Sequence, residues 1–530
     1  MSSRITEIED RRSRLHKGGG AKAIERQHQL GKLTARERMD MLFGGAGFQE
    51  SELWIRPIKT GFDIDSRELP GDAVIIGVGE IQGRPVCAYA HDFTVAGGTF
   101  GSAFHHKVTR LMETALARRI PCIQIIDSGG ERIHDWFGRP AHRPVLGGRI
   151  SIAGTSCMYH APVILSGVVP QITLMLGPMY AGSAYIPTMA DFMIMRRGTS
   201  FMSVASPPLV KAVTFQDVTQ EELGGAELHA TTTGTPDFLV ESDEEAIEIC
   251  RELLSYIPLN NNQRPPIVDM GDDSNRKEEK LAQIVPEDLS KPYDMHEVIR
   301  CIVDGGKFLE LQQLYAKSII IGFARLDGQT VGIVANNPAE SDGILTLNTC
   351  DKQARFIRWC DAFNVPLIFL VDTPGFLSDV QQEQSRDGLL RTVSKPVFAI
   401  GEATVPMVCV YIGKCYGLSH LIMGTLRMGI DTAYSWPSAQ VARMDPERAA
   451  QIIYDEESGS SEKPENTRKE KLEELRKKFI QYPYHAAEQA MVNDIIDPRN
   501  TRPVLIQTLK SLKYKEPSPR PYRKHSLAPQ

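Results

Sequence analysis

The sequence repeats itself, and this repeat limits the folds that the chain can adopt. Residues 77–130 align with residues 322–375 without a gap, at a constant offset of 245 (322 − 77). An ordered series of identities over this length is typical of a tandem duplication, so each half should fold as the same unit. The identical pairs are Gly77/Gly322, Gly83/Gly328, Val86/Val331, Gly98/Gly343, Lys107/Lys352, Arg110/Arg355, Pro121/Pro366, Asp127/Asp372 and Gly130/Gly375.

A second block continues the repeat further along the chain. "VVPQITLMLGPMYAGSAYIP" (168–187) lies over "TVPMVCVYIGKCYGLSHLIM" (404–423) at an offset of 236 (404 − 168), a net deletion of nine residues (245 − 236). Both copies have Val-Pro, an apolar run, a glycine, a tyrosine and then small residues. This pattern predicts an apolar strand closed by a tight turn, built twice.

Each half has the pattern of βαβ units. "DAVIIGVGEIQGRPVCAYA" predicts a hairpin, and a helical stretch with apolar residues at three- and four-residue spacing follows it. Strands that alternate with helices predict two packed α/β layers, one per half, with functional turns at the carboxyl ends of strands. The polar, charge-rich stretch 260–280 separates the halves, so the predicted domains are 1–275 and 276–530.

The composition is that of a soluble globular protein. A chain of 530 residues is too long for one ordinary core, and 42% apolar and 24% charged residues are usual values. A net charge of −6 without a basic stripe argues against a nucleic-acid partner. We expect no signal peptide, because the start of the chain is acidic and polar. We also expect no membrane span, because no run of about 18 apolar residues occurs. The nine cysteines include no CxxC pair and mostly lie in apolar runs, which favours a reducing cytoplasm and argues against a zinc site.

Several common catalytic motifs are missing. "DTPGF" (372–376) resembles a nucleotide-hydrolase motif, but no GxxxxGK[ST] phosphate loop accompanies it. "GVGEIQG" (77–83) precedes a turn and a strand where a dinucleotide site needs a helix. HExxH and GxSxG do not occur, and Ser128 lies outside any nucleophile elbow.

The two turns of small residues, "PMYAGSAY" (178–185) and "KCYGLSHL" (414–421), are the remaining candidates for chemistry. In one interpretation they only allow strand and helix to pack closely. In the other, two adjacent backbone N–H groups at each turn point at a developing oxyanion, which requires close approach and no catalytic side chain. Two such holes would suit a reaction between two carbonyl-containing partners.

The sequence as a whole resembles the carboxyltransferase (β) subunit of biotin-dependent acyl-CoA carboxylases, of the propionyl-CoA carboxylase type. The resemblance runs nearly from end to end. It includes "IERQHQLGKLTARERMDMLF", "DFTVAGGTFG", "DSGGERI", "GFARLDGQTVGIVANNP", "ARFIRWCDAFNVPLIFLVDTPGFL" and "ATVPMVCVYIGKCYG".

This resemblance implies a crotonase-like fold in each half and a ring of six chains. The active site would lie between the first half of one subunit and the second half of another. Carboxybiotin, carried on a separate biotin carboxylase and carrier (α) subunit, would deliver its carboxyl group to the α-carbon of an acyl-CoA. One hole would stabilise the thioester enolate and the other the ureido oxygen of biotin, and no metal would take part.

By position, the resemblance assigns the holes to Gly182–Ser183, for biotin, and Leu418–Ser419, for the thioester. It makes the first domain the acyl-CoA side and the second the biotin side. The implied biotin contacts are Pro374, Gly375 and Phe376, and the implied acyl-CoA contacts are Ser128, Gly129, Gly130 and Arg132.

Some residues depart from the family pattern. Where the family commonly has Gly-Gly-Ala, this chain has Gly417-Leu418-Ser419-His420, and Leu421 replaces a residue that is often polar. Leu418, His420 and Leu421 are therefore predicted to set the acyl specificity. The segment "HDWFGRPAHRP" (134–144) is also unusual, although its histidines can equally be ordinary hydrogen-bonding residues.

Two alternatives stay open at this point. The chain could be the carboxyltransferase of a biotin-dependent acyl-CoA decarboxylase, or a scaffold homologue whose second turn has lost activity. The sequence contains no AMKM-like biotin attachment site and no ATP-binding domain. A carboxylase or a decarboxylase component would therefore require a biotin-bearing partner.

Overall fold

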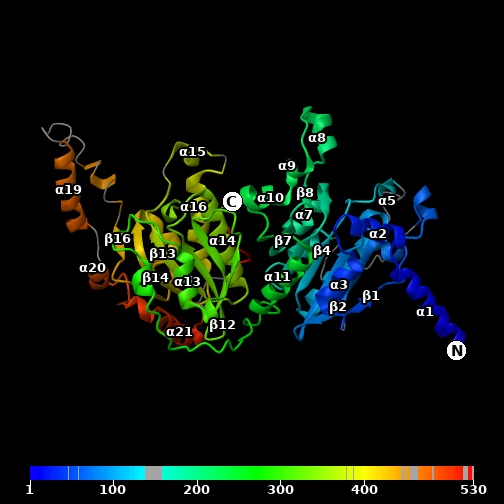
Figure 1. Cartoon of the computed structure of the whole chain (residues 1–530), viewed down its shortest axis with the longest axis horizontal. Coiled ribbons are helices and arrows are strands. Elements are labelled where there is room, and N and C mark those ends of the chain that lie inside the picture. Colours follow the sequence, from blue (N-terminus) through cyan, green and yellow to red (C-terminus); the bar gives the residue numbers. More distant parts are fainter. Residues whose placement is uncertain are drawn as a thin grey trace. The chain divides into compact units, whose positions relative to one another are not determined.

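The computed structural model divides into two compact units, residues 1–263 and 264–530, and each is described by itself (Figure 1). The structure describes the chain except residues 46, 58, 138–157, 378, 386, 443, 446–447, 451, 454–463, 480–482, 517–522 and 528–530. The division falls within the polar stretch 260–280, on the amino-terminal side of the boundary placed at residue 275 from the sequence.

Unit 1 is built on a seven-stranded sheet in the order β1-β2-β3-β4-β5-β7-β9, with β6 and β8 paired separately. The β1–β2 and β2–β3 pairs are antiparallel and the later pairs are parallel. The strands are β1 (Gln49–Ser51), β2 (Val74–Ile81), β3 (Arg84–His91), β4 (Cys122–Ile126), β5 (Gln171–Met175), β6 (Pro178–Tyr180), β7 (Phe192–Arg196), β8 (Phe201–Ser203) and β9 (Phe238–Val240). The helices are α1 (Ser2–His16), α2 (Ala21–Gln29), α3 (Ala35–Phe43), α4 (Ser102–Arg118), α5 (Ile133–Phe137), α6 (His160–Leu165), α7 (Tyr185–Thr188), α8 (Pro207–Thr214), α9 (Gln220–Gly224), α10 (Ala226–Leu228) and α11 (Asp243–Tyr256).

Unit 2 contains an eight-stranded sheet in the order β10-β11-β12-β13-β14-β15-β17, with β16 added on β14. Its strands are β10 (Phe308–Leu311), β11 (Ile319–Leu326), β12 (Gln329–Asn336), β13 (Leu367–Thr373), β14 (Met407–Tyr416), β15 (Thr432–Ser435), β16 (Gln440–Ala442) and β17 (Asp494–Ile495). Its helices are α12 (Leu281–Ile284), α13 (Met295–Ile302), α14 (Leu347–Ala362), α15 (Val380–Glu383), α16 (Leu389–Glu402), α17 (His420–Met423), α19 (Pro464–Phe479), α20 (Pro483–Glu488) and α21 (Thr501–Ser511).

The two units repeat the same hairpin in the same register. Val74 pairs with His91 in β2–β3, and Ile319 pairs with Asn336 in β11–β12. Both partners are displaced by the offset read from the sequence, since 319 − 74 and 336 − 91 both equal 245. The next two strands are parallel in both units. This agreement supports the duplication inferred from the sequence.

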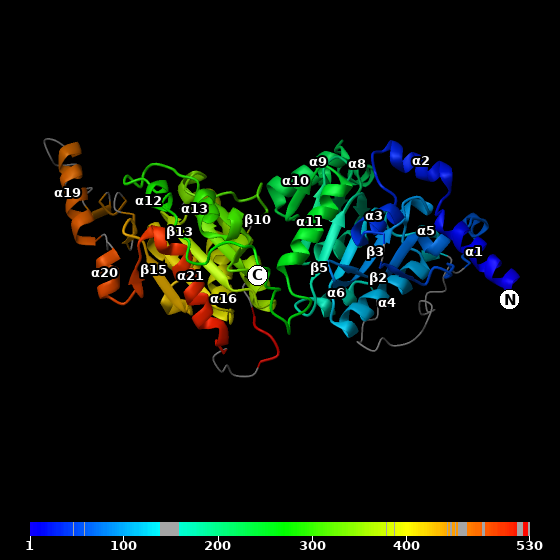
Figure 2. The same ribbon diagram turned by 60° about the horizontal axis from the view of Figure 1, so that its bottom comes forward.

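Helices cover both faces of the unit 1 sheet. Figure 2 shows α3 and α11 on one side of the strands and α4 and α6 on the other. The apolar face of α4, which includes Phe104, Val108 and Leu111, packs in one buried cluster with Val74 and Ile76 of β2. The spacing of these residues at three and four positions places them on one side of the helix, as the sequence pattern predicted.

A buried lysine in each unit bonds to backbone carbonyls at the start of the hairpin. Lys107 Nζ donates to the carbonyl oxygens of Gly71, at 2.9 Å, and Val74. Lys352 Nζ donates to the carbonyl oxygens of Gln312, Tyr315 and Ile319 at 2.8–3.0 Å. Burial lowers the pKa of Lys107 to about 8. Because Val74 and Ile319 are equivalent positions, the lysine identity in the repeat reflects one conserved buried contact.

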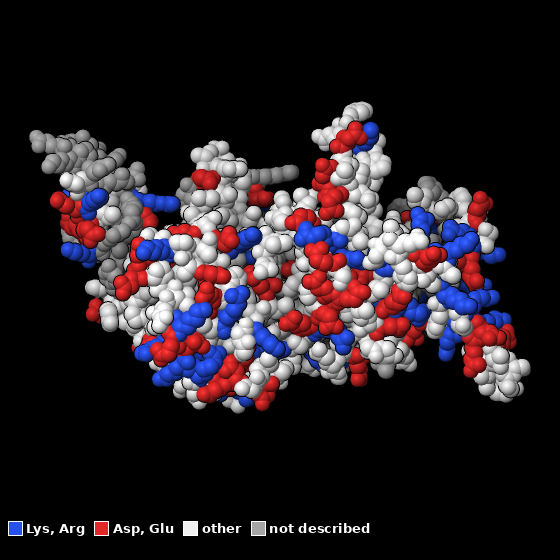
Figure 3. All heavy atoms as spheres, viewed as in Figure 1, with Lys and Arg blue, Asp and Glu red and all other residues white. Residues whose placement is uncertain are grey.

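The surface agrees with the charge balance of the sequence. On the face drawn in Figure 3, basic and acidic side chains are interspersed. No helix among the described residues is both long enough and apolar enough to cross a membrane. The described cysteines are all free thiols, and all but Cys301 are buried, while Cys157 lies outside the described residues. Within the described part of the chain, no group of three His, Cys, Asp or Glu side chains is arranged to hold a metal ion.

Candidate active site

The first turn of small residues follows strand β6. Ala181 has φ +58°, and a 3₁₀ turn covers Ala181–Ala184. The hydroxyl of the buried Ser183 donates to the carbonyl oxygen of Tyr180 at 2.6 Å. A Cβ atom at Gly182 would lie 3.4 Å from the hydroxyl oxygen of Tyr159, so this turn lies beside the Tyr159 side chain.

The second turn has the same geometry at the end of β14. Gly417 has φ +66°, and a 3₁₀ turn covers Gly417–Ser419. The hydroxyl of the buried Ser419 donates to the carbonyl oxygen of Tyr416 at 2.7 Å. Each of these residues lies 236 positions after its counterpart in unit 1, as in 419 − 183 and 416 − 180. The predicted similarity of the two turns is therefore confirmed in three dimensions.

Each turn begins as a helix does, with backbone N–H groups at its first positions. A left-handed residue starts each one and redirects the chain, and glycine takes this conformation in unit 2 without a steric penalty. The first N–H groups of a helical turn have no partner within the helix. Gly182, Ser183, Leu418 and Ser419 lie in these turns, and the role of their N–H groups as donors to a bound oxygen atom stays a prediction.

A glycine turn after the neighbouring strand packs against each of these turns. A Cβ atom at Gly130 would lie 3.6 Å from the carbonyl oxygen of Tyr180, and one at Gly375 would lie 3.2 Å from that of Tyr416. The N–H of Gly130 donates to the hydroxyl of Ser128 at 3.0 Å, and the N–H of Gly375 donates to the hydroxyl of Thr373 at 3.1 Å. Each unit therefore brings together two of the segments that the sequence analysis selected.

The other predicted contacts occupy different surroundings. Gly129 is exposed, and its N–H donates to the carbonyl oxygen of Gly97 at 2.9 Å. Pro374 and Phe376 are half-buried, in the same turn as Gly375. Arg132 is buried, and its guanidinium donates to the carboxylate of Asp72 at 2.5 Å. This geometry gives Arg132 a structural ion pair, and its contact with acyl-CoA stays a prediction.

The predicted specificity residues lie in the second turn, at Leu418, or directly after it, at His420 and Leu421. The side chain of Leu418 is 65% exposed, at the position that Gly182 occupies in unit 1 (418 − 236 = 182). His420 bonds through Nδ1 to the carbonyl oxygen of Gly417 at 2.9 Å, and Leu421 is half-buried. Residues 138–144 of the unusual segment lie outside the described residues.

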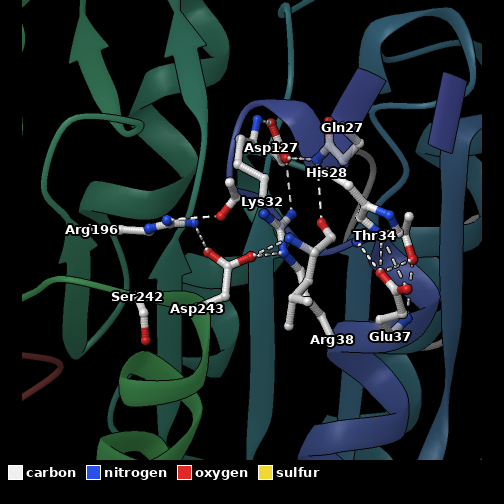
Figure 4. Close-up of polar contacts among 12 residues, drawn as sticks. Gln27, His28, Lys32, Thr34, Glu37, Arg38, Asp127, Arg196, Ser242 and Asp243 are labelled. Atoms are coloured by element: carbon white, nitrogen blue, oxygen red, sulfur yellow. Dashed lines mark hydrogen bonds and ion pairs between the residues drawn. The ribbon is translucent and has the colours of Figure 1, made fainter. Parts of the chain in front are cut away.

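Two buried carboxylates, Asp127 and Asp372, have partners that were not predicted from the sequence. Asp127 directly follows β4, and Asp372 is the last residue but one of β13. Their identity in the repeat was visible, but their partners were not. Asp127 accepts hydrogen bonds from Lys32 at 2.6 Å, Gln27 at 2.8 Å and Arg38 at 2.9 Å. Figure 4 shows Arg38 between Asp127 and Asp243, to which it also donates at 2.8 Å. This network ties the helices α2 and α3 to the strand end beside the first turn.

Asp372 has a different set of partners. Its carboxylate accepts a hydrogen bond from the hydroxyl of Tyr293 at 2.8 Å and from the backbone N–H of Lys414 at 2.9 Å. Burial raises the pKa of Asp372 to about 6, against the opposing effect of the Lys414 ammonium group.

Comparison with known proteins identifies the family. Residues 26–528 match the carboxyl transferase domain. The chain is 40% identical to the carboxyltransferase subunit of propionyl-CoA carboxylase from Haloferax mediterranei, over all of this chain and 99% of the relative. It is 38% identical to the alpha subunit of methylmalonyl-CoA decarboxylase from Veillonella parvula, with the same coverage.

A crystal structure of transcarboxylase 12S, with methylmalonyl-coenzyme A and methylmalonic acid bound, superposes with a TM-score of 0.92. The identity is 40%, and the match covers 100% of this chain and 98% of that chain. The protein is thus a carboxyltransferase by fold and by sequence. The chain belongs to the carboxyl transferase family, with the crotonase-like α/β fold that the resemblance implied, so the predicted family, fold class and enzyme class are confirmed.

Arg38 provides a stability test of the buried network. Replacing Arg38 by methionine leaves Asp127 and Asp243 with one fewer cation, so we expect the free energy of unfolding of the unit that contains them to fall by about 3–5 kcal/mol. Arg36→Met is the matched control, because Arg36 pairs with Glu50 in a partly exposed position and should cost about 1 kcal/mol or less. Equal losses in the two variants, measured by chemical denaturation, would contradict the assignment.

Asp372 gives the stability a defined pH dependence. Its pKa is raised in the folded protein, so the folded state holds this proton more tightly than the unfolded state. Its favourable contribution is complete below pH 3.8, the ordinary value, and is lost as the pH rises through about 6, a change of about 3 kcal/mol. Asp372→Asn should therefore gain stability relative to the natural protein between pH 4 and pH 7, as measured by denaturation at each pH. A pH-independent difference would show that the carboxyl group is not perturbed.

Proposed function

We propose that this chain transfers a carboxyl group between a biotin carried on a partner subunit and the α-carbon of an acyl-CoA. The observation that carries this proposal is the pair of equivalent turns, which present backbone N–H groups at the carboxyl ends of equivalent strands. The family membership and the acyl-CoA substrates named for its relatives support it.

The chemistry requires two stabilised oxygen atoms. Removing a proton from the α-carbon of a thioester moves negative charge onto the carbonyl oxygen. Backbone donors fixed before the reaction stabilise such charge without reorganisation, and each contributes about 3–4 kcal/mol. We assign Gly182–Ser183 and Leu418–Ser419 as the two donor pairs, the second for the thioester and the first for biotin. Ser183 and Ser419 fix the turns through their hydroxyl bonds to the preceding tyrosine carbonyls.

The turns next to the donor pairs are proposed to shape the two pockets. A Cβ atom at Gly130 would lie 3.6 Å from the carbonyl oxygen of Tyr180, and one at Gly375 would lie 3.2 Å from that of Tyr416, so both glycines lie against the carbonyls that accept the serine hydroxyls of the turns. We propose that, in a site shared between two copies, the acyl-CoA contacts Ser128–Gly130 of one copy and the donor pair Leu418–Ser419 of the other, and that biotin contacts Pro374–Phe376 and the donor pair Gly182–Ser183. Biotin, when bound, supplies the carboxyl group, and the residues of this chain position it and exclude water.

The proposal also includes the assembly. Transcarboxylase 12S forms a hexamer, and we propose a ring of six chains here, with each site shared between the first unit of one copy and the second unit of another. A biotin carboxylase and biotin carrier subunit would be the partner. The free thiols of the described cysteines support a reducing cytoplasmic location.

The direct test is turnover by the purified chain with free biotin. We expect biotin-dependent decarboxylation of one or more of malonyl-CoA, methylmalonyl-CoA and bulkier carboxyacyl-CoAs, measured as released carbon dioxide. The substrate with the highest kcat/KM would define the acyl group. Binding of the CoA esters without turnover would refute the proposal in favour of an inactive scaffold.

Leu418 is proposed to restrict the acyl group. Its side chain projects from the second turn where unit 1 has glycine, so Leu418→Ala should raise kcat/KM for the bulkier acyl-CoAs relative to the smaller ones. About tenfold is expected, because the space of a few methylene groups is worth 1–3 kcal/mol in an apolar pocket. Leu390→Ala is the control, since Leu390 is an exposed leucine of α16, outside the turn. An unchanged substrate profile in Leu418→Ala would contradict the role.

A further inference from the structure

The two buried carboxylates, Asp127 and Asp372, occupy equivalent positions in the repeat but have different hydrogen-bond partners. In unit 2, the backbone N–H of Lys414 donates to Asp372 at 2.9 Å. The equivalent residue of unit 1 is Pro178 (414 − 236 = 178), which has no N–H to donate. Asp127 therefore has no such backbone group to accept from and is bound by the side chains of α2, α3 and the loop between them. The hydrogen bond from the backbone of the neighbouring strand to this carboxylate is thus present in unit 2, where the equivalent residue of unit 1 is a proline.

The N–H of Lys414 lies in an irregular part of strand β14. The pairing of β13 and β14 runs in register up to Val371 with Tyr411, and it resumes with Thr373 opposite Cys415. Between these pairs β13 advances by two residues and β14 by four, which is a bulge in β14. A bulge takes backbone groups out of the ladder and re-aims the strand. Asp372 satisfies the N–H that this bulge releases.

The position of the bulge connects it to the second turn. Lys414 precedes Gly417 by three residues, and Thr373 leads into Gly375, whose Cβ position lies 3.2 Å from the carbonyl oxygen of Tyr416. A Cβ atom at Gly413 would lie 2.1 Å from the carboxylate of Asp372, so the strand closes directly over this group. A substitution at Asp372 is therefore expected to displace both the turn at Gly375 and the turn at Gly417–Ser419.

We propose that Asp372 is a positioning residue for the second oxyanion turn, holding the β14 bulge through the Lys414 N–H so that Gly417–Ser419 keep the shape that accepts an oxygen anion. This inference rests on the proposed function for its kinetic consequence. Its structural consequence, the rigidity of the turn, can be measured without turnover.

The groups around Asp372 define which substitution preserves the contact. Tyr293 faces it from the loop before α13, and Lys414 and Cys415 face it from β14. The Lys414 ammonium group pairs with Asp342. An asparagine at 372 can still accept from the Lys414 N–H through its oxygen and can donate to the Tyr293 hydroxyl oxygen through its amide nitrogen. Alanine can do neither.

The experiment compares Asp372→Ala, Asp372→Asn and the control Asp431→Ala. Asp431 is the matched carboxylate, because it accepts the N–H of Met407, the first residue of the same strand, at 2.8 Å. Amide hydrogen exchange of a peptide spanning residues 412–420 and the steady-state kinetics of carboxyacyl-CoA decarboxylation are measured for each full-length variant.

We expect Asp372→Ala to exchange faster than the natural protein in this peptide and to lose about 10- to 100-fold in kcat with little change in KM, as expected for a shifted transition-state contact. Asp372→Asn should exchange no faster than the natural protein and should keep its kcat, and Asp431→Ala should leave exchange in this peptide unchanged. If Asp372→Ala does not fold, Asp372→Leu, which has a similar shape and also lacks an acceptor, takes its place in the comparison.

Two results would overturn the inference. One is faster exchange or a large loss of kcat in Asp372→Asn. The other is equal exchange in Asp372→Ala and Asp431→Ala. If the natural protein itself shows no turnover, the proposed function fails, while the exchange comparison still decides the role of Asp372.

Discussion

The close contact between a buried carboxylate and a glycine of the neighbouring strand is the constraint on which both sites depend. A Cβ atom would lie 1.9 Å from the carboxylate of Asp127 at Gly177, and 2.1 Å from that of Asp372 at Gly413. Any side chain at either glycine would push the strand away from its neighbour. The strand can therefore continue into the turn of small residues only because it passes directly over the carboxylate. The N–H groups that we propose as donors follow this glycine by five and six residues in each unit.

The two copies meet the cost of burying this carboxylate differently. In unit 1, the cations Lys32, between α2 and α3, and Arg38 of α3 compensate the charge, and the neutral amide of Gln27 in α2 also donates to it, which fastens the amino-terminal helices to the end of β4. In unit 2, uncharged donors satisfy the oxygens, and the carboxyl group keeps a raised pKa. The duplication thus preserved the geometry of the strand ends while the surrounding interactions diverged. This is the pattern expected when the turn geometry, and not the charge, is what function requires.

Much of this arrangement could be predicted from the sequence. The offset of the repeat predicted that both halves contain the same hairpin, and the observed registers differ by that offset, because alternating apolar positions and tight turns are local signals. The turns at Gly182 and Leu418 were also identified, since small residues after an apolar strand are a local pattern. The partners of Arg132 and Asp127 were not, because Asp72 and Arg38 lie 60 and 89 residues away in the sequence. Only the folded chain brings such groups together, and no periodicity encodes the pairing.

In the proposed function, backbone N–H groups, and not side chains, stabilise the reaction. Proline in place of Ser183 or Ser419 removes one of these N–H groups, whereas alanine at the same position removes the hydroxyl and keeps the N–H. The decisive measurement is kcat for biotin-dependent decarboxylation in these two pairs of variants, with circular dichroism to confirm that each is folded. We expect a loss of about 10²- to 10³-fold for each proline variant and a much smaller loss for each alanine variant. Equal losses in proline and alanine variants would assign the effect to the serine side chains and contradict the role of the N–H groups.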